Sequence, residues 1–89
     1  MRKWLASFER MLDDDEKEWA NYFEEEFLNW AREKLTGIDG FHNIRYGKFE
    51  RSYRIISIDV EFDHPDKMFP ALIPTFDNWV VVQVKRFNK

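Results

Sequence analysis

Large apolar side chains lie three or four positions apart over the first twelve residues of the chain. Charged residues occupy most of the positions between them. This period is typical of an amphipathic helix that packs one side against a core. We therefore predict a short first helix over residues 2–12. Its apolar stripe consists of Trp4, Leu5, Phe8, Met11 and Leu12.

A second apolar stripe predicts a longer helix that reaches about residue 36. The stripe consists of Trp19, Phe23, Phe27, Trp30, Ala31 and Leu35. Either Asp13 or Asp15 could start this helix in a capping box with the glutamate three positions later. Gly37 is placed to end it as a left-handed C-cap. The two predicted helices could instead run on as one.

From Gly40 onward the apolar period changes to two, which predicts β-strands. Residues 41–46 and 49–62 are predicted to pair as antiparallel strands through a type II′ turn at Gly47–Lys48. The pairing sets Tyr46 opposite Phe49, Arg45 opposite Glu50 and Ile44 opposite Arg51.

Three prolines favour a loop over most of residues 63–75, with room for one helical turn. Residues 79–87 are predicted to form a further strand. A short edge segment that turns at Asp77–Asn78 could precede it.

Together these elements predict an α+β fold in a single domain, residues 1–89. One or two N-terminal helices pack on a three- to four-stranded antiparallel sheet, in the order α-α-β-β-(β)-β. Residues 1–37 form the helical, acidic part, and residues 38–89 form the antiparallel sheet.

The predicted strand over residues 49–62 changes the face that carries its apolar residues. From Ile56 onward the even positions are apolar, whereas Phe49, Tyr53 and Ile55 occupy odd positions. A strand with one solvent-facing side keeps one parity. A β-bulge near Ile55, or coverage of the second face by the first helix, would explain the change. The alternative is that the outer half of the hairpin contacts another molecule.

The net charge of −3 hides two oppositely charged regions. Residues 13–26 hold eight carboxylates against one lysine, whereas residues 45–54 hold four Lys/Arg against one glutamate. Sixteen residues are aromatic, more than a domain of this size is expected to bury completely. We therefore expect some of the rings to lie on an interface.

Catalytic and metal-binding motifs are missing from the sequence. Without cysteine, the chain has no disulfide, no thiolate nucleophile and no cysteine-based zinc site. His42 and His64 lack partners at metal-ligand spacing, and no serine lies in a nucleophile-elbow context. We predict no enzyme activity, no metal and no cofactor.

No apolar run approaches the roughly 20 residues that span a bilayer. Glu9 also ends the first apolar stretch too early for a signal peptide. We therefore expect a cytoplasmic protein that does not bind membranes.

Three sets of residues are candidate binding sites. The acidic helix face, which could dock on a protein partner, consists of Asp14, Asp15, Glu18, Glu25 and Glu26. The hairpin patch, which could bind a partner or form a homodimer, consists of Ile44, Tyr46, Phe49, Arg51 and Tyr53. The cations that could contact a nucleic acid are Arg45, Lys48, Arg51 and Arg54. Rings with arginine at the rim are typical of binding hot spots, and rings with interleaved cations are typical of single-strand binders.

These features predict a small non-enzymatic protein-binding protein that uses the acidic helix, the hairpin or both. The composition resembles that of small phage-encoded proteins that inhibit host enzymes, which implies an inhibitor or adaptor acting in a host cytoplasm. The alternative is a small RNA- or single-stranded-DNA-binding protein that uses the basic and aromatic hairpin.

Overall fold

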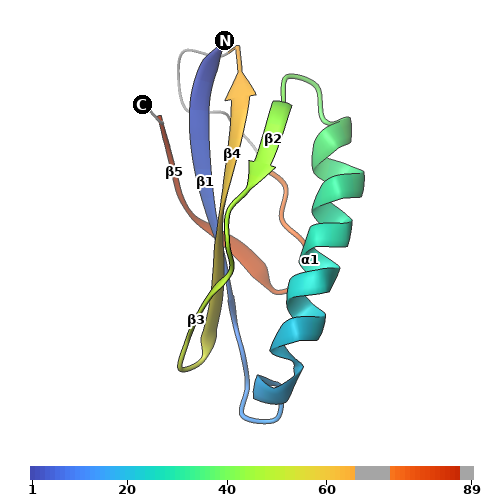
Figure 1. Ribbon diagram of the computed structural model, residues 1–89, viewed down its shortest axis with the longest axis vertical. Helices are drawn as coiled ribbons and strands as arrows, with labels where there is room; N and C mark the ends of the chain where they lie inside the picture. The colour runs from blue at the N-terminus through green and yellow to red at the C-terminus, as the bar shows by residue number, and fades with distance from the viewer. Residues whose placement is uncertain (66–72, 87–89) are drawn as a thin grey trace.

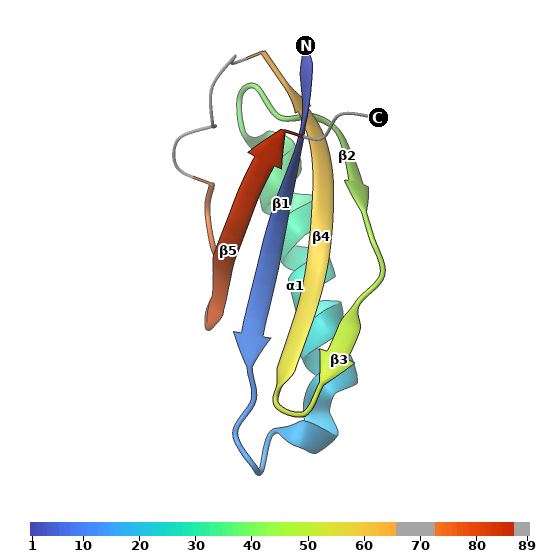
Figure 2. The same ribbon diagram turned by 90° about the vertical axis from the view of Figure 1, so that its left-hand side faces the viewer.

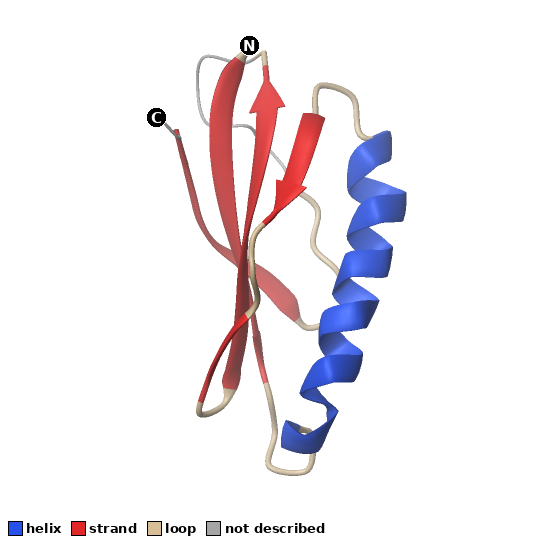
Figure 3. Cartoon of the chain, in the orientation of Figure 1, coloured by secondary structure: helices blue, strands red, loops and turns tan. Residues whose placement is uncertain are grey.

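The chain begins with a strand, not with a helix. The computed structural model describes residues 1–65 and 73–86 (Figures 1 and 3). Its strands, α-helix and two 3₁₀ turns (η) are, in order, β1 (Arg2–Met11), η1 (Lys17–Trp19), α1 (Ala20–Lys34), η2 (Leu35–Gly37), β2 (His42–Tyr46), β3 (Glu50–Ser52), β4 (Ile55–His64) and β5 (Trp79–Arg86). The predicted α+β class with an antiparallel sheet is confirmed. The described part of the chain has one α-helix and five strands.

The five strands form one antiparallel sheet, with α1 across one of its faces. Four strands follow the order β2-β4-β1-β5, and β3 pairs with β4 farther along the edge that β2 occupies. Figure 1 shows the helix against one side of the sheet. Figure 2 shows the opposite side, which no described element covers. The fold therefore has two layers, and its core lies between the helix and one face of the sheet.

The first apolar segment is a central strand, so the predicted helix over residues 2–12 is wrong. β1 pairs with β4 on one edge and with β5 on the other. Its even positions face the core, where Trp4, Ala6 and Phe8 are buried. A step of four residues returns to the same side of a helix and of a strand, so Trp4 and Phe8 fit either pattern. Pairing with segments distant in the sequence selects the strand.

α1 agrees with the predicted second helix in its centre and differs from it at both ends. In the turn before it, the Asp13 amide donates to Glu16 Oε1 at 2.9 Å, and the Glu16 amide donates to the Asp13 carbonyl at 2.9 Å. These contacts resemble a capping box, placed one 3₁₀ turn ahead of α1. The predicted C-cap at Gly37 is wrong, because Gly37 belongs to η2 and the left-handed glycine is Gly40 (φ 91°).

The helical segment buries most of the predicted stripe. Its fully buried residues are Ala20, Phe27 and Ala31, followed by Leu35 in η2. Phe23 and Trp30 are partly buried against the core, and the carboxylate of Glu24 reaches Arg51 of β3. Trp19, which the sequence placed in the buried stripe, is the exception and is 57% exposed.

Phe27 joins the two layers of the fold. Its ring is fully buried. Its centroid lies 5.1 Å from that of Phe8 on β1, and 4.6 Å from that of Trp79 on β5. Phe49, in the link between β2 and β3, lies 6.2 Å away in edge-on geometry. Such ring pairs add to the free energy gained by burying apolar surface.

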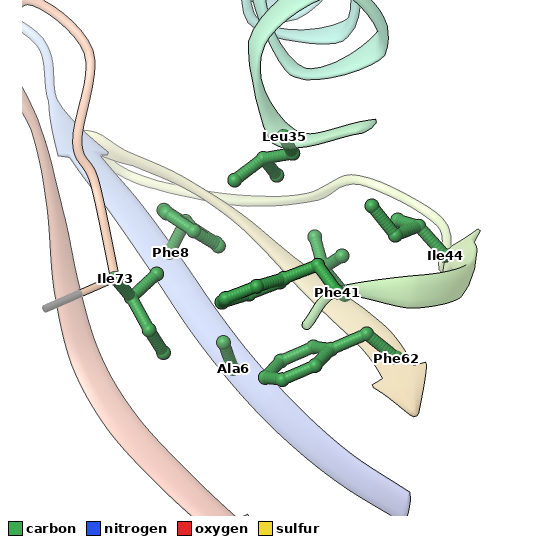
Figure 4. Close-up of a pocket in the computed structure, with 8 residues that line it drawn as sticks. Ala6, Phe8, Leu35, Phe41, Ile44, Phe62 and Ile73 are labelled. Atoms are coloured by element: carbon green, nitrogen blue, oxygen red, sulfur yellow. The ribbon is translucent and has the colours of Figure 1, made fainter. Parts of the chain in front are cut away.

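Apolar packing also closes the end of the core where α1 finishes. Figure 4 shows the Phe41 ring between Leu35 and the Phe62 ring, with Ile44 and Ile73 at the sides. The two rings stack with centroids 4.6 Å apart. The remaining space between these side chains is too small for a water molecule. This region is therefore packed core and not a ligand cavity.

The predicted strand over residues 49–62 is two strands joined by a tight turn. β3 and β4 pair with each other, with Ser52 opposite Ile55, and the chain reverses at Tyr53–Arg54. The change of parity near Ile55 is this reversal. It is neither a β-bulge within one long strand nor the result of a second covering helix.

The turn predicted at Gly47–Lys48 is wrong, together with the pairing across it. β2 pairs with β4, with Tyr46 opposite Val60, and the chain then continues along the same edge to β3. The Gly47 amide donates to the Asp59 carbonyl at 2.9 Å. A Cβ at Gly47 would lie 3.0 Å from that carbonyl oxygen, so the close approach of the two strands favours glycine there.

The last predicted strand is confirmed as β5, and the turn predicted before it lies at Asp77–Asn78. Residues 73–76 contain no strand. The predicted loop over residues 63–75 begins only after His64, because β4 continues to that residue. Residues 66–72 of this loop, and residue 87 of the predicted strand, lie outside the described part.

Arg10 is a buried cation where β1, the first turn and the start of β5 meet. It is 3% exposed, and its guanidinium carbon lies 3.8 Å from the centroid of the Phe23 ring. Its Nη2 is 3.3 Å from Glu16 Oε2 and 4.0 Å from Asp77 Oδ2. A buried charge needs such partners. Arg10 therefore ties the entry to α1 to the centre of the sheet.

Replacing Glu16 by glutamine should make the stability of the fold less sensitive to acid. The hydrogen bond from the Asp13 amide and the contact with Arg10 lower the pKa of Glu16 below its ordinary value of 4.5. A carboxyl group with a lowered pKa stabilises the folded state above its ordinary pKa, and the contribution is lost as the pH falls through the folded value.

Urea unfolding near pH 7 and near pH 3 measures this effect. We expect acid to remove more stability from the wild-type chain than from Glu16→Gln. The exposed Glu33→Gln is the control and should behave as wild type. Equal acid losses in wild type and Glu16→Gln would contradict the prediction.

Candidate functional site

The first half of the helical segment carries two exposed rings among carboxylates. Trp19 is 57% exposed and Tyr22 is 49% exposed, and the rings meet edge-on with centroids 6.0 Å apart. Residues three or four positions apart lie on the same side of a helix, which places Glu18, Glu25 and Glu26 beside these rings. We call this set the acidic–aromatic surface: Glu18, Trp19, Tyr22, Glu25 and Glu26.

Of the three carboxylates on this surface, only that of Glu26 has a side-chain partner among the described residues. Glu18 and Glu25 are exposed, and neither forms an ion pair with any described residue. The Tyr22 hydroxyl donates to Glu26 Oε2 at 2.8 Å, and this bond raises the pKa of Tyr22. The bond holds the Tyr22 side chain along the helix. The surface therefore combines a pair of aromatic rings, of which Tyr22 is held by a hydrogen bond, with two exposed carboxylates that form no ion pair with a described residue.

The predicted acidic residues before the helix have different environments. Asp14 lies 3.5 Å from Lys17 Nζ and 2.5 Å from Arg54 Nη2, which belongs to the turn between β3 and β4. Asp15 is exposed in the turn that precedes η1. The structure thus brings Glu18, with Glu25 and Glu26, onto one surface and engages Asp14 in an intramolecular ion pair.

The residues of the predicted hairpin patch do not form one surface. Ile44, Tyr46 and Phe49 are half-buried and pack against the core. Tyr53 lies away from them in the turn between β3 and β4, where it is 75% exposed. The Nζ atom of Lys17 is 4.1 Å from the centroid of the Tyr53 ring.

Arg51, predicted as part of two sites, links β3 to the helix. Its Nε and Nη2 atoms lie 2.7 Å and 2.9 Å from the two carboxylate oxygens of Glu24, and Nη2 also contacts the Asn21 side chain. The hydrogen bonds to Glu24 raise the pKa of Arg51. A two-pronged contact of this kind fixes the arginine in one direction. Arg51 would have to leave Glu24 before it could bind a phosphate in this way.

Other cations of the predicted nucleic-acid site are also paired. Arg45 lies 3.4 Å from Glu61 and 3.5 Å from Asp63 on the neighbouring strand. Arg54 contacts Asp14, as described above. Lys48 is exposed and forms no ion pair with a described residue. These pairs reduce the positive potential available to a polyanion.

The uncovered face of the sheet is polar in its middle. The Ser7 hydroxyl donates to Asp59 Oδ1 at 2.7 Å beside a shallow groove of about 240 Å³. Exposed apolar side chains, among them Met11 and Val80, lie toward one end of this face. Within residues 1–65 and 73–86, no group of three or more histidine, aspartate or glutamate side chains could hold a metal ion.

Trp19 is the residue of the acidic–aromatic surface that the sequence pattern assigned to the core. Its spacing to Phe23 and Phe27 fitted the predicted buried stripe. The available signal was the alternative side formed by Ala20, Phe27 and Ala31, which also fall at helical spacing. That side points away from Trp19.

Comparisons with known proteins gave no match to this chain. No protein-family model matches it, and no match to a curated protein or to a solved structure was found. Among the described residues, no helix combines the length and the apolar character needed to cross a membrane.

Truncating Phe49 should destabilise the fold, whereas truncating Tyr53 should not. Phe49 packs against Phe27 and Trp79, so Phe49→Ala removes apolar contacts and should cost about 2–4 kcal/mol. Tyr53 is 75% exposed, and Tyr53→Ala should cost less than about 1 kcal/mol. Urea unfolding of both variants measures the difference. Similar stabilities for the two would show that Phe49 is not part of the core.

Proposed function

We propose that this chain is a non-enzymatic protein-binding protein, an inhibitor or adaptor, that binds a basic surface of a protein partner through the acidic–aromatic surface. The observation that carries the proposal is the exposed pair of Trp19 and Tyr22 beside the carboxylates of Glu18 and Glu25. Tryptophan and tyrosine are enriched among the residues that dominate binding energy. Large rings left at a surface mark interaction sites.

The negative charge of the acidic–aromatic surface indicates that the partner presents a basic surface. The carboxylates of Glu18 and Glu25 attract lysine and arginine and speed the encounter at low salt. An arginine or lysine of the partner that reaches the Trp19 ring also gains cation–π energy. A basic groove with room for one large ring could bind both the carboxylates and the Trp19 ring.

The remaining parts of the proposal rest on the sequence. The chain has no nucleophile in a recognisable catalytic context, which favours binding over catalysis. The cytoplasmic location, the phage-type origin and a homodimer stay predictions. Light scattering on the purified protein measures the last of these.

Replacing the two rings should abolish partner binding without unfolding the chain. The tagged protein would first be used to capture its partner from a host lysate, and the affinity for the purified partner would then be measured. We expect Trp19→Ala to weaken binding by about 2 kcal/mol or more, roughly 30-fold. Trp19→Ala with Tyr22→Ala should remove it. Thermal unfolding should change little, because both rings are exposed.

Charge reversal tests the electrostatic part separately. Glu25→Lys should lower the association rate, and the difference from wild type should shrink as salt is added. Glu33→Lys is the matched control, because it makes the same charge change two turns farther along the same helix. Equal effects of the two variants would contradict a role for this surface. Salt-dependent binding to a short single-stranded oligonucleotide, lost in Arg51→Glu and Arg54→Glu, would favour nucleic-acid binding instead.

A further inference from the structure

An open groove of about 300 Å³ lies between the C-terminal half of the helical segment and β2. Figure 1 shows β2 beside this part of α1. The residues that line the groove are Arg32, Thr36, Phe41, His42, Asn43, Ile44 and Tyr46. Arg32 is ten residues beyond Tyr22, about 15 Å along the helix, so the groove is separate from the acidic–aromatic surface.

Tyr46 supplies a hydrogen-bond donor without a partner. Its hydroxyl oxygen is buried and makes no hydrogen bond within the described part of the chain. Burial raises the pKa of Tyr46 above its ordinary value of 10.0, and the charge of Arg32 opposes this shift only in part. A buried hydroxyl is normally hydrogen-bonded, and its lack of a partner calls for an explanation.

Arg32 is a cation without a counter-charge. It is exposed and forms no ion pair with any described residue, in contrast to Arg45, Arg51 and Arg54. No carboxylate is among the residues that line the groove. In a chain with net charge −3, this groove is thus a local site of positive charge.

The wall of the groove is partly apolar and its backbone is irregular. Phe41 is buried and Ile44 is half-buried, so Ile44 presents more apolar surface to a ligand than Phe41 does. Asn43 has a left-handed backbone (φ 51°) at the point where the register between β2 and β4 shifts. Its side-chain Nδ2 donates to Asp63 Oδ2 at 2.8 Å, which holds the irregular segment in place. Irregular backbone of this kind is concentrated at ligand sites.

We propose that this groove binds a small carboxylate that carries an apolar group. The guanidinium of Arg32 receives the carboxylate, the Tyr46 hydroxyl donates a hydrogen bond to it, and the apolar group lies against Phe41 and Ile44. Arginine matches carboxylate geometry through two parallel hydrogen bonds. Ligand pockets combine an apolar lining with a few convergent polar groups in the same way.

Titration of the ¹⁵N-labelled chain with sodium phenylacetate tests this proposal. We expect saturable shifts of the amide signals of His42 to Tyr46 and of Arg32 to Thr36, with a dissociation constant in the millimolar range. Arg32→Gln should weaken binding about tenfold, because it removes the cation. Tyr46→Phe should weaken binding several-fold while the chain stays folded, because the lost hydroxyl has no partner within the described part.

Two controls separate this site from non-specific attraction. Lys48→Gln removes an exposed, unpaired cation outside the groove and should bind phenylacetate as wild type does. Phenylacetamide has the same shape without the charge and should bind at least tenfold more weakly. The proposal is overturned if no amide shift saturates, if phenylacetamide binds as tightly as phenylacetate, or if Arg32→Gln binds as wild type does. None of these results bears on binding through the acidic–aromatic surface.

Discussion

The burial of one ring, Phe27, determines how the helix lies on the sheet. Its neighbours come from β1, from β5 and from the link between β2 and β3, so one side chain holds segments that are distant along the sequence. Ala20 and Ala31 are buried on the same side of the helix. With this side fixed inward, Trp19 and Tyr22 have to face outward. The exposed surface of the helix is thus a consequence of its core.

Local signals were enough to predict the centre of α1, the change to β period and the last strand. They failed over residues 2–12, because the spacing of Trp4 and Phe8 is shared by a helix and a strand. They also failed at Gly47, where the glycine is required by the nearby Asp59 carbonyl and not by a turn. In both places the deciding partner lies elsewhere in the sequence, so no local window contains it.

Helical spacing was enough to predict which carboxylates of the candidate site share one face of the helix. Glu18 and Glu25 were expected on an open face, and the structure leaves them exposed and without ion pairs to described residues. The environment of Asp14 could not be predicted, because it depends on Arg54, which is 40 positions later. Arg51 had the composition of an interface residue, and only the folded structure brings it to Glu24. Pairing of charges across the fold decides which of them remain available to a partner.

The central place of β1 has a consequence for the order in which the structure can assemble. β1 comprises residues 2–11, and its two neighbours are residues 55–64 and 79–86. During synthesis at roughly 5–20 residues per second, this strand waits several seconds for both of its neighbours. Until both neighbours have been made, the rings of Trp4 and Phe8 cannot be buried against the completed sheet. Pairing of segments so far apart in the sequence also slows folding. Removing β5 would turn the middle of the sheet into an open edge, which is a template for aggregation.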